Sequence, residues 1–243
     1  MNMWKSHWNQ LWRLFFLQTS RNNRTVDGLG FFHVLSPLIN RWANNQREKA
    51  DISRRHLQYF NANPICASHV VGVVENLEER RTSGDEISGE QIERMKDALS
   101  AVITARGDYF FEVVLVPLGL TIGSIFAIYS SYVGPVIFLA LYNYYHFQAR
   151  IGGYLKGVQL GEGLGGEHVT NIFKEQGFLG GCAAFASGAF TALVFTRASD
   201  MGGLRYVGWG IASIVGFLLL RRRLPFVWSV AIVFLTTFLF LLV

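Results

Sequence analysis

The chain has 243 residues, of which 51% are apolar and only 16% are charged, and its formal net charge is +5. Soluble domains carry about 25% charged residues, so this composition excludes a disordered chain, a collagen-like chain and an ordinary soluble enzyme. The first 106 residues hold 14 of the 22 Lys/Arg and 11 of the 17 Asp/Glu. We therefore predict an N-terminal helical part that is cytoplasmic or interfacial, residues 1–106, and a membrane domain, residues 107–243.

The first segment, residues 3–18, has the pattern of an amphipathic helix. Trp4, Trp8, Leu11, Trp12 and Phe15 share one helical face, and Lys5, Asn9 and Gln10 lie elsewhere. Aromatic anchors on one face are typical of a helix that lies in the headgroup region of a bilayer. Arg13 interrupts the apolar run and no small-residue cleavage site follows, so we reject a signal peptide.

The next segments also predict helices. Residues 28–42 form an apolar patch too short to span a membrane, and residues 49–58 are charged and predicted to be helical. An Asn-Pro pair at Asn63 and Pro64 breaks the chain. A helix is expected over about 65–81, ending before Gly84.

A capping box predicts the start of the following helix. Ser88 is followed three residues later by Gln91, and each can bond the backbone of the other. The apolar side of this helix comprises Ile92, Met95, Leu99, Val102 and Ile103.

Five long apolar runs follow Arg106 and predict an all-α integral membrane protein with about five transmembrane or re-entrant helices. They cover about 110–131, 133–147, 177–196, 203–220 and 225–243. Spanning takes about 20 residues, so the first two runs could instead form a re-entrant pair. The basic turn Arg221–Arg223 is predicted to be cytoplasmic, which places the N-terminus inside and the C-terminus outside. The excess positive charge fits this topology and not a nucleic-acid surface, because no basic cluster is interleaved with aromatic residues.

Glycine and cysteine do not indicate a cofactor or a metal site. Gly161, Gly163 and Gly166 spell GxGxxG, but no strand precedes them, so we reject a dinucleotide site. Glycines in this region are expected to let helices approach closely. Cys66 and Cys182 form no CxxC motif and are predicted to be small buried residues.

Ionisable residues near the membrane boundary allow two readings. Asp108 and Glu112 share one helical face, and Arg106 is the expected ion-pair partner of Asp108. The alternative is a hydrogen-bonding wall for a polar solute. Asn143, His146 and Gln148, followed by Arg150, either line a polar path or meet headgroups.

No motif of an autonomous enzyme is present. The six histidines lack HxxxH and HExxH spacing, and there is no GxSxG elbow and no Walker-type lysine loop. His56, within Arg54-Arg55-His56, is predicted to belong to a solvated cationic face.

Several ordered stretches resemble the IID membrane component of the mannose/fructose/sorbose family of sugar phosphotransferase systems (PTS). Residues 54–64 resemble the family's RRHLxFFNxxP segment, and residues 72–84 resemble its GVxxALEExRAxG segment. Residues 107–111 are similar to a GD-x-x-FW element, and residues 134–143 to GPLLFFxxFN. Gly28–Phe31 matches GLGF, and Arg221–Arg223 with Trp228 resembles the last hairpin.

The resemblance implies a function and partners. IID and IIC subunits form an inner-membrane permease, IIA and IIB carry phosphate, and a hexose-type sugar is phosphorylated as it enters. The resemblance also implies a trimer of IIC–IID pairs and a non-catalytic role for IID, without a cofactor. Within the family-like segments we predict a sugar-binding site formed by Asn61, Asn63, Asp108 and Asn143, because short amides and carboxylates suit hydroxyl-rich solutes.

Departures from the family pattern leave three readings open. Arg106 stands where the family has small residues and could fill the space beside Asp108 or neutralise it; Glu112 and His146 also depart from the pattern. The chain is then a working IID subunit, or a degenerate IID that acts as a membrane sensor or regulatory scaffold without transport. The third reading is an unrelated membrane enzyme with Asp108 and Glu112 as an acid/base pair.

Overall fold

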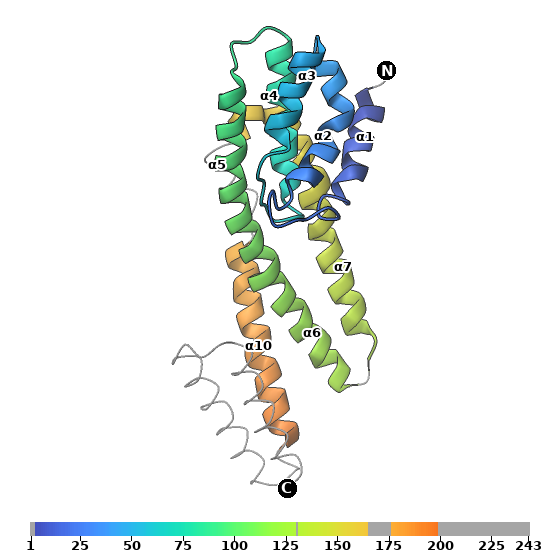
Figure 1. Ribbon diagram of the computed structural model, residues 1–243. Helices are drawn as coiled ribbons and strands as arrows, with labels where there is room; N and C mark the ends of the chain where they lie inside the picture. Colours follow the sequence, from blue (N-terminus) through green and yellow to red (C-terminus); the bar gives the residue numbers. More distant parts are fainter. Residues whose placement is uncertain (1–2, 130, 165–175, 199–243) are drawn as a thin grey trace. The chain divides into compact units, whose positions relative to one another are not determined.

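The computed structural model describes residues 3–129, 131–164 and 176–198. Every regular element in these ranges is a helix, apart from two isolated β-bridges, from Asn22 to Val26 and from Val26 to Phe60 (Figure 1). The chain divides into two compact units, residues 1–184 and residues 185–243. The account below concerns the first unit, in which the helical part of the fold prediction is confirmed for the described residues.

Four helices form the N-terminal part of this unit. They are α1 (Met3–Leu14), α2 (Gly28–Trp42), α3 (Gln46–His56) and α4 (Ala67–Thr82). Asn45 caps α3, since its side chain accepts a hydrogen bond from the Glu48 backbone. The chain leaves α4 through Gly84, whose φ of 108° suits glycine. The predicted helix over 65–81 and its end before Gly84 are therefore confirmed.

A long continuous helical segment follows. It comprises α5 (Gly89–Asp108), the π-helical turn η1 (Tyr109–Leu115) and α6 (Val116–Ile128). The capping box is present as predicted, with both the Ser88 and the Gln91 hydrogen bonds formed. Pro117 explains why the helix widens at η1: its ring lacks an N–H and would collide with the carbonyl four residues earlier in an α-helix.

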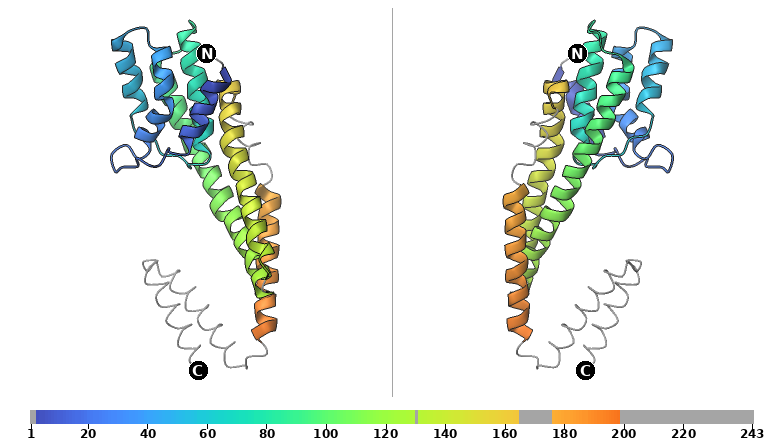
Figure 2. Two further views of the ribbon diagram at one scale, coloured as in Figure 1. Left: turned by 90° about the vertical axis from the view of Figure 1, so that its right-hand side faces the viewer. Right: turned by 90° about the vertical axis from the view of Figure 1, so that its left-hand side faces the viewer.

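The chain then turns back along this segment. The returning elements are α7 (Val133–Phe147), a second π-helical turn η2 (Gln148–Gly152), α8 (Gly153–Leu160) and the short 3₁₀ helix η3 (Gly161–Leu164). The turned views show α6 and α7 side by side as a hairpin that extends from the N-terminal helices (Figure 2). Close packing depends on glycine, because a Cβ at Gly134 would lie 2.9 Å from the Gly123 Cα.

The core of the unit is built around α4. Its residues from Ala67 to Val74 are all buried, and it packs against α8, α5 and α2. The contact with α8 is the tightest: a Cβ at Gly157 would lie 2.5 Å from the His69 carbonyl oxygen and 2.9 Å from the Gly72 Cα. The prediction that glycines allow close helix approach is thus confirmed at Gly157. This contact brings α8, and the end of the hairpin, against the N-terminal helices.

The membrane predictions have separate outcomes. Within the described residues, one helix, Gly89–Ile128, is long and apolar enough to cross a bilayer by length and composition. The boundary predicted at residue 106 lies inside this continuous helix and stays a prediction. The run 177–196 corresponds to α10 (Gln176–Ala198), which crosses from the first unit to the second. The last two runs and the basic turn at 221–223 lie outside the described residues.

The first helix is two-sided, but its buried side differs from the prediction, because Leu11 is buried apart from the tryptophans and Gln10 is buried as well. Leu11 and Leu14 of α1 are buried, whereas Trp8 and Trp12 are 70% and 61% exposed. Phe15, which follows α1, also stays exposed and contacts the ring of Phe147. The shared face of Trp8 and Trp12 is therefore confirmed, the placing of Leu11 on that face is wrong, and the position of the helix at a bilayer surface stays a prediction.

Candidate functional site

Two of the four predicted site residues meet directly. The Asn63 side-chain amide donates a hydrogen bond to Asp108 Oδ1 at 2.7 Å, although the residues are 45 positions apart. Asn63 is buried, and Asp108 is half-buried at the end of α5. A hydrogen bond to a carboxylate is stronger than one between neutral groups. The pair therefore fixes the turn before α4 to the point where α5 becomes π-helical.

The other atoms of Asn63 shape the turn itself. Its side-chain oxygen accepts from the backbone N–H of Ile65 and of Cys66, at 3.1 and 3.2 Å. Its own backbone N–H donates to the Thr104 hydroxyl at 3.2 Å. Gly107 permits this approach, since a Cβ there would lie 2.9 Å from the Cys66 sulfur. The Asn-Pro and Gly-Asp pairs thus belong to one structural unit.

Arg150 holds the same turn from the other side. Its guanidinium donates to the Leu14 carbonyl at 2.7 Å and to the Pro64 carbonyl at 3.0 Å, and it lies 4.5 Å from the centre of the Phe15 ring. Its side chain is buried at 6% exposure. From the sequence, Arg150 is noted only as the residue that follows Asn143, His146 and Gln148, for which a polar path or headgroup contacts are expected. Its burial under the Asn63 turn has no local signal, because both acceptors come from distant segments.

The remaining two predicted site residues lie apart from this pair. Asn61 is exposed, and its side-chain oxygen accepts from Arg21 at 3.4 Å. Asn143 is exposed on α7, where its amide donates to the Leu139 carbonyl one turn earlier at 2.8 Å. The described structure therefore brings together Asn63 and Asp108, whereas Asn61 bonds to Arg21 and Asn143 bonds within its own helix.

The expected Arg106–Asp108 ion pair is wrong for the described residues. Arg106 is exposed, and within the described ranges Asp108 is bonded to Asn63 instead. The Arg106 backbone carbonyl accepts from the Gln176 side chain at 3.1 Å. Glu112 is exposed as well. The idea that Arg106 fills the space beside Asp108 or neutralises that carboxylate stays a prediction.

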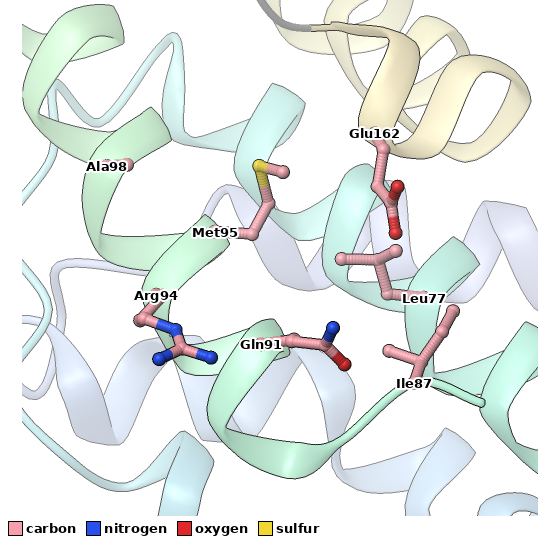
Figure 3. Close-up of a pocket in the computed structure, with 7 residues that line it drawn as sticks. All are labelled: Leu77, Ile87, Gln91, Arg94, Met95, Ala98 and Glu162. Carbon is pink, nitrogen blue, oxygen red and sulfur yellow. The ribbon is translucent and has the colours of Figure 1, made fainter.

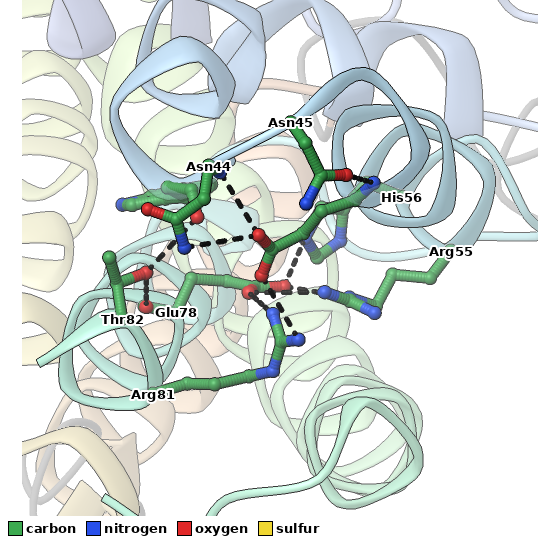
Figure 4. Close-up of polar contacts among 9 residues, drawn as sticks. Asn44, Asn45, Arg55, His56, Glu78, Arg81 and Thr82 are labelled. Carbon is green, nitrogen blue, oxygen red and sulfur yellow. Dashed lines mark hydrogen bonds and ion pairs between the residues drawn. The ribbon is translucent and has the colours of Figure 1, made fainter. Parts of the chain in front are cut away.

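A second polar cluster, centred on the buried Glu78, lies between α3 and α4 (Figure 4). Arg55 Nε donates to Glu78 Oε1 at 2.7 Å, and His56 Nε2 lies 2.9 Å from the same oxygen. Arg81 lies 3.6 Å from the other oxygen, Oε2. The prediction of a solvated face at His56 is wrong, since His56 is only 1% exposed. Its neighbours in sequence are basic, but its partner is a carboxylate 22 residues away.

The charges within this cluster are set by burial and by these contacts. Burial opposes ionisation of Glu78, but hydrogen bonds from His56 and Arg55 outweigh it and lower the pKa of Glu78 to about 2. Burial also lowers the pKa of His56, so the ring is neutral at pH 7 and donates through Nε2. The paired, buried carboxylate of Glu78 thus joins the end of α3 to α4.

The mainly apolar pocket drawn in Figure 3 lies between α4, α5 and η3. Its volume is about 330 Å³, and its lining comprises Leu77, Ile87, Gln91, Arg94, Met95, Ala98 and Glu162. None of the predicted site residues lines it. Among the described residues there is also no group of three or more His, Cys, Asp or Glu side chains that could hold a metal. Cys66 is buried as predicted, whereas Cys182 is only half-buried.

The comparisons with known proteins identify the family. Residues 4–187 match the family model of the PTS mannose/fructose/sorbose family IID component. This chain belongs to that family. IID components are membrane subunits of the sugar permease of this phosphotransferase system.

Named relatives and solved structures agree with this assignment. The chain is 30% identical over 203 residues to the mannose-specific EIID component of Escherichia coli strain K12, covering 78% of this chain and 71% of the relative. It is 26% identical over 200 residues to the fructose permease IID component of Bacillus subtilis strain 168, covering 77% and 72%. A cryo-EM structure of the mannose transporter ManYZ in complex with microcin E492 matches with a TM-score of 0.57 and 28% identity, covering 78% of this chain and 70% of that one. A structure described as a membrane protein matches with a TM-score of 0.66 and 28% identity, covering 76% and 68%.

The family-like segments of this IID component meet in space. Arg55 and His56 of the RRHL-like segment bind Glu78 of the GVxxALEE-like segment. Asn63, at the end of the first segment, binds Asp108 of the Gly-Asp element. The motifs therefore specify contacts between α3, α4 and α5.

Proposed function

We propose that this IID component works with a IIC subunit in the phosphorylation-coupled uptake of a hexose-type sugar. In this proposal IIA and IIB phosphocarriers supply the phosphate, and this chain is a non-catalytic part of the permease. The observation that carries the proposal is the intact Asn63–Asp108 hydrogen bond at 2.7 Å, with Arg106 exposed and unbonded to Asp108 in the described chain. It favours a working subunit over a degenerate sensor or scaffold.

The sugar-facing site in this proposal is centred on Asp108. Asp108 is half-buried and has a carboxylate that can accept from sugar hydroxyl groups in addition to Asn63. Asn63 orients that carboxylate. Asn143 is an exposed polar residue in an apolar helix, and such residues face a partner or a water-filled path. We propose that Asn143 faces the IIC subunit, and that Asn61 lies at the rim of the site.

The proposed membrane arrangement is a multi-pass protein of the bacterial inner membrane with a cytoplasmic N-terminus, assembled as a trimer of IIC–IID pairs. The exposed Trp8 and Trp12 of α1 support an interfacial position for the first helix, because tryptophan is enriched at the headgroup level. The Phe15 ring contacts the ring of Phe147 on α7, so the aromatic surface extends from α1 to α7.

The test is uptake of labelled mannose-type sugars by cells that carry the matching IIC, IIA and IIB proteins. We expect Asp108→Asn to lower uptake at least about tenfold, because a hydrogen bond to a charged group contributes about 1.5–3 kcal/mol. Asn143→Ala is expected to lower it less. Co-purification with IIC shows that each variant still assembles.

Two outcomes would contradict the proposal. If Asp108→Asn and Asn143→Ala both leave uptake unchanged while assembly is intact, the site assignment fails. If the wild-type chain binds IIC but supports no uptake of any hexose-type sugar, the chain is the sensor or scaffold that the sequence left open.

A further inference from the structure

Three polar side chains, one each from α1, α4 and α8, meet where α1 packs against the other two helices. The Tyr154 hydroxyl oxygen on α8 lies 2.6 Å from Glu75 Oε2 on α4, within hydrogen-bonding distance. His7 Nδ1 on α1 lies 2.9 Å from the same hydroxyl and 3.7 Å from Glu75 Oε1. Glu75 and Tyr154 are enclosed, whereas the His7 side chain is 23% exposed. His7 is thus the member of this cluster that water reaches.

The hydrogen bonds of the cluster have two consistent arrangements that differ by one proton. With Glu75 ionised, the Tyr154 hydroxyl donates to Glu75, and His7 must donate its Nδ1 proton to the hydroxyl oxygen. With Glu75 protonated, the carboxyl donates to Tyr154, and Tyr154 donates to an unprotonated Nδ1. In the second arrangement His7 carries its proton on Nε2.

The passage between the two arrangements moves protons along the chain of three groups. Glu75 gives its proton to the Tyr154 oxygen, and the hydroxyl proton passes to His7 Nδ1. The imidazolium then releases its Nε2 proton to water. One proton leaves in total, and Glu75 gains one negative charge.

The surroundings favour the protonated carboxyl. Burial raises the pKa of Glu75 to about 7, against a lowering by the Tyr154 hydrogen bond. The other charged groups that act on it are Glu79 on α4, which raises the pKa, and Arg41 on α2, which lowers it. Those two bind each other at 2.8 Å, so they act on Glu75 as a largely neutral pair.

Some buried polar atoms where α1 packs on α4 and α8 lack hydrogen-bond partners among the described residues. Gln10, one turn from His7, is fully buried, and neither atom of its amide has a hydrogen-bond partner in the described chain. Glu75 Oε1 also lacks one. Each unsatisfied buried polar atom costs about 1–3 kcal/mol. These unsatisfied atoms oppose the packing of α1, and a buried charge on Glu75 adds to that cost.

We propose that His7, Tyr154 and Glu75 form a proton-operated latch that seats α1 on α4 and α8. The latch is closed when Glu75 carries a proton. Loss of that proton leaves a buried carboxylate with Tyr154 as the hydrogen-bond donor to Oε2 and no hydrogen-bond donor to Oε1 in the described residues, and α1 loosens so that water reaches it. The latch responds to pH and is independent of the proposed sugar uptake.

The direction of the pH dependence follows from the difference in the Glu75 pKa between the seated and the loosened state of α1. A hydrated glutamate has a pKa of about 4.5, and the seated state raises it to about 7. The seated state is therefore fully favoured below about pH 4.5 and loses that advantage as the pH rises through about 7.

The experiment is hydrogen–deuterium exchange of the full chain in lipid nanodiscs, with or without IIC, corrected for intrinsic exchange rates. Between about pH 6 and pH 8, either side of the Glu75 pKa, we expect the protection of the α1 amides to fall about tenfold. Glu75→Gln should keep α1 protected at both pH values. Tyr154→Phe should move the midpoint to higher pH, because it removes the hydrogen bond that lowers the pKa. Glu86→Gln, which changes an exposed loop carboxylate, should behave like the wild type.

A second measurement reads the proton itself. Infrared difference spectra of wild type minus Glu75→Gln should contain the carbonyl stretch of a protonated carboxylic acid that disappears as the pH rises through neutrality. The proposal is overturned if α1 protection in the wild type is independent of pH, if Glu75→Gln retains the dependence, or if no such band titrates. Both readouts concern α1 and Glu75 in the absence of sugar, so they stand or fall separately from uptake.

Discussion

Arg55 and Glu78 form a buried ion pair at 2.7 Å that joins α3 to α4. The two side chains are 9% and 0% exposed, and His56 donates to the same carboxylate oxygen as Arg55. Breaking a buried pair by removing one charge is costly, because the other charge stays in the interior. This contact fixes the position of the turn that carries Asn63.

We predict that Glu78→Gln destabilises the folded chain by about 3–5 kcal/mol. The matched control is Glu79→Gln at the next position, where the carboxylate pairs with Arg41 and both side chains are partly exposed. That change should cost about 1 kcal/mol or less. Thermal unfolding of the solubilised protein compares the two variants, and equal losses would contradict the assigned role of Glu78.

The same carboxylate gives a pH dependence with a defined sign. The folded chain lowers the Glu78 pKa from 4.5 to about 2, so its contribution is fully present above about pH 4.5 and is lost as the pH falls towards 2. We predict that wild type loses stability across this window and that Glu78→Gln loses much less. Unfolding midpoints measured from about pH 5 to pH 3 test this, and parallel curves would refute it.

Asn63 and Asn61 provide a second matched pair. Asn63→Ala removes the bond to Asp108 and the two side-chain bonds at the start of α4. We expect a loss of about 2–4 kcal/mol in stability, combining a helix-start cap with a charge-assisted bond. Asn61→Ala, at an exposed site, should cost less than about 0.5 kcal/mol. Thermal unfolding measures both, and a smaller loss at Asn63 than at Asn61 would contradict the geometry.

Alanine is expected to have opposite effects at two glycines, Gly157 in the α4–α8 contact and Gly152 in η2. A Cβ at Gly157 would lie 2.5 Å from the His69 carbonyl, so Gly157→Ala should destabilise the chain by about 1–3 kcal/mol. A Cβ at Gly152 meets nothing within 4 Å, so Gly152→Ala should be neutral or stabilising by about 0.5–1 kcal/mol. Unfolding temperatures of the two variants decide the point. A tolerated alanine at residue 157 would show that the helices can separate freely.

Arg106 supplies a prediction about function. Its side chain is exposed, and Asp108 is bonded to Asn63 in its place. We therefore expect Arg106→Ala to leave sugar binding by the purified IIC–IID pair within about twofold of wild type, since a twofold change is under 0.5 kcal/mol. A clear rise in affinity would mean that the arginine blocks the site after all.

Local patterns predicted the helices well because their causes are local. The Ser88–Gln91 capping box and the end of α4 before Gly84 need only residues within a few positions. The spacing of Trp8 and Trp12 likewise put both on one face of α1, which is exposed, but the same pattern wrongly put Leu11 there. The family resemblance added the identity of the segments that meet.

The site was harder to predict because its contacts are long-range. His56 looked solvated beside two arginines, yet its partner Glu78 lies 22 residues away. Arg150 is held by carbonyls of Leu14 and Pro64, and backbone acceptors leave no trace in a sequence. Asn143 shares the residue type of Asn63 but bonds within its own helix. Residue type therefore identified candidates and could not decide which of them meet.

The two π-helical turns have a mechanical consequence. Such a turn carries one surplus residue, and shifting it along a helix rotates the stretch it passes by about 100° while the backbone remains hydrogen-bonded. In η1 that rotation is resisted by Phe110 and Phe111, whose rings lie 5.2 Å from Tyr145 and 5.9 Å from Tyr142. These aromatic pairs join η1 to α7, and they oppose a change in the rotation of α6 relative to α7.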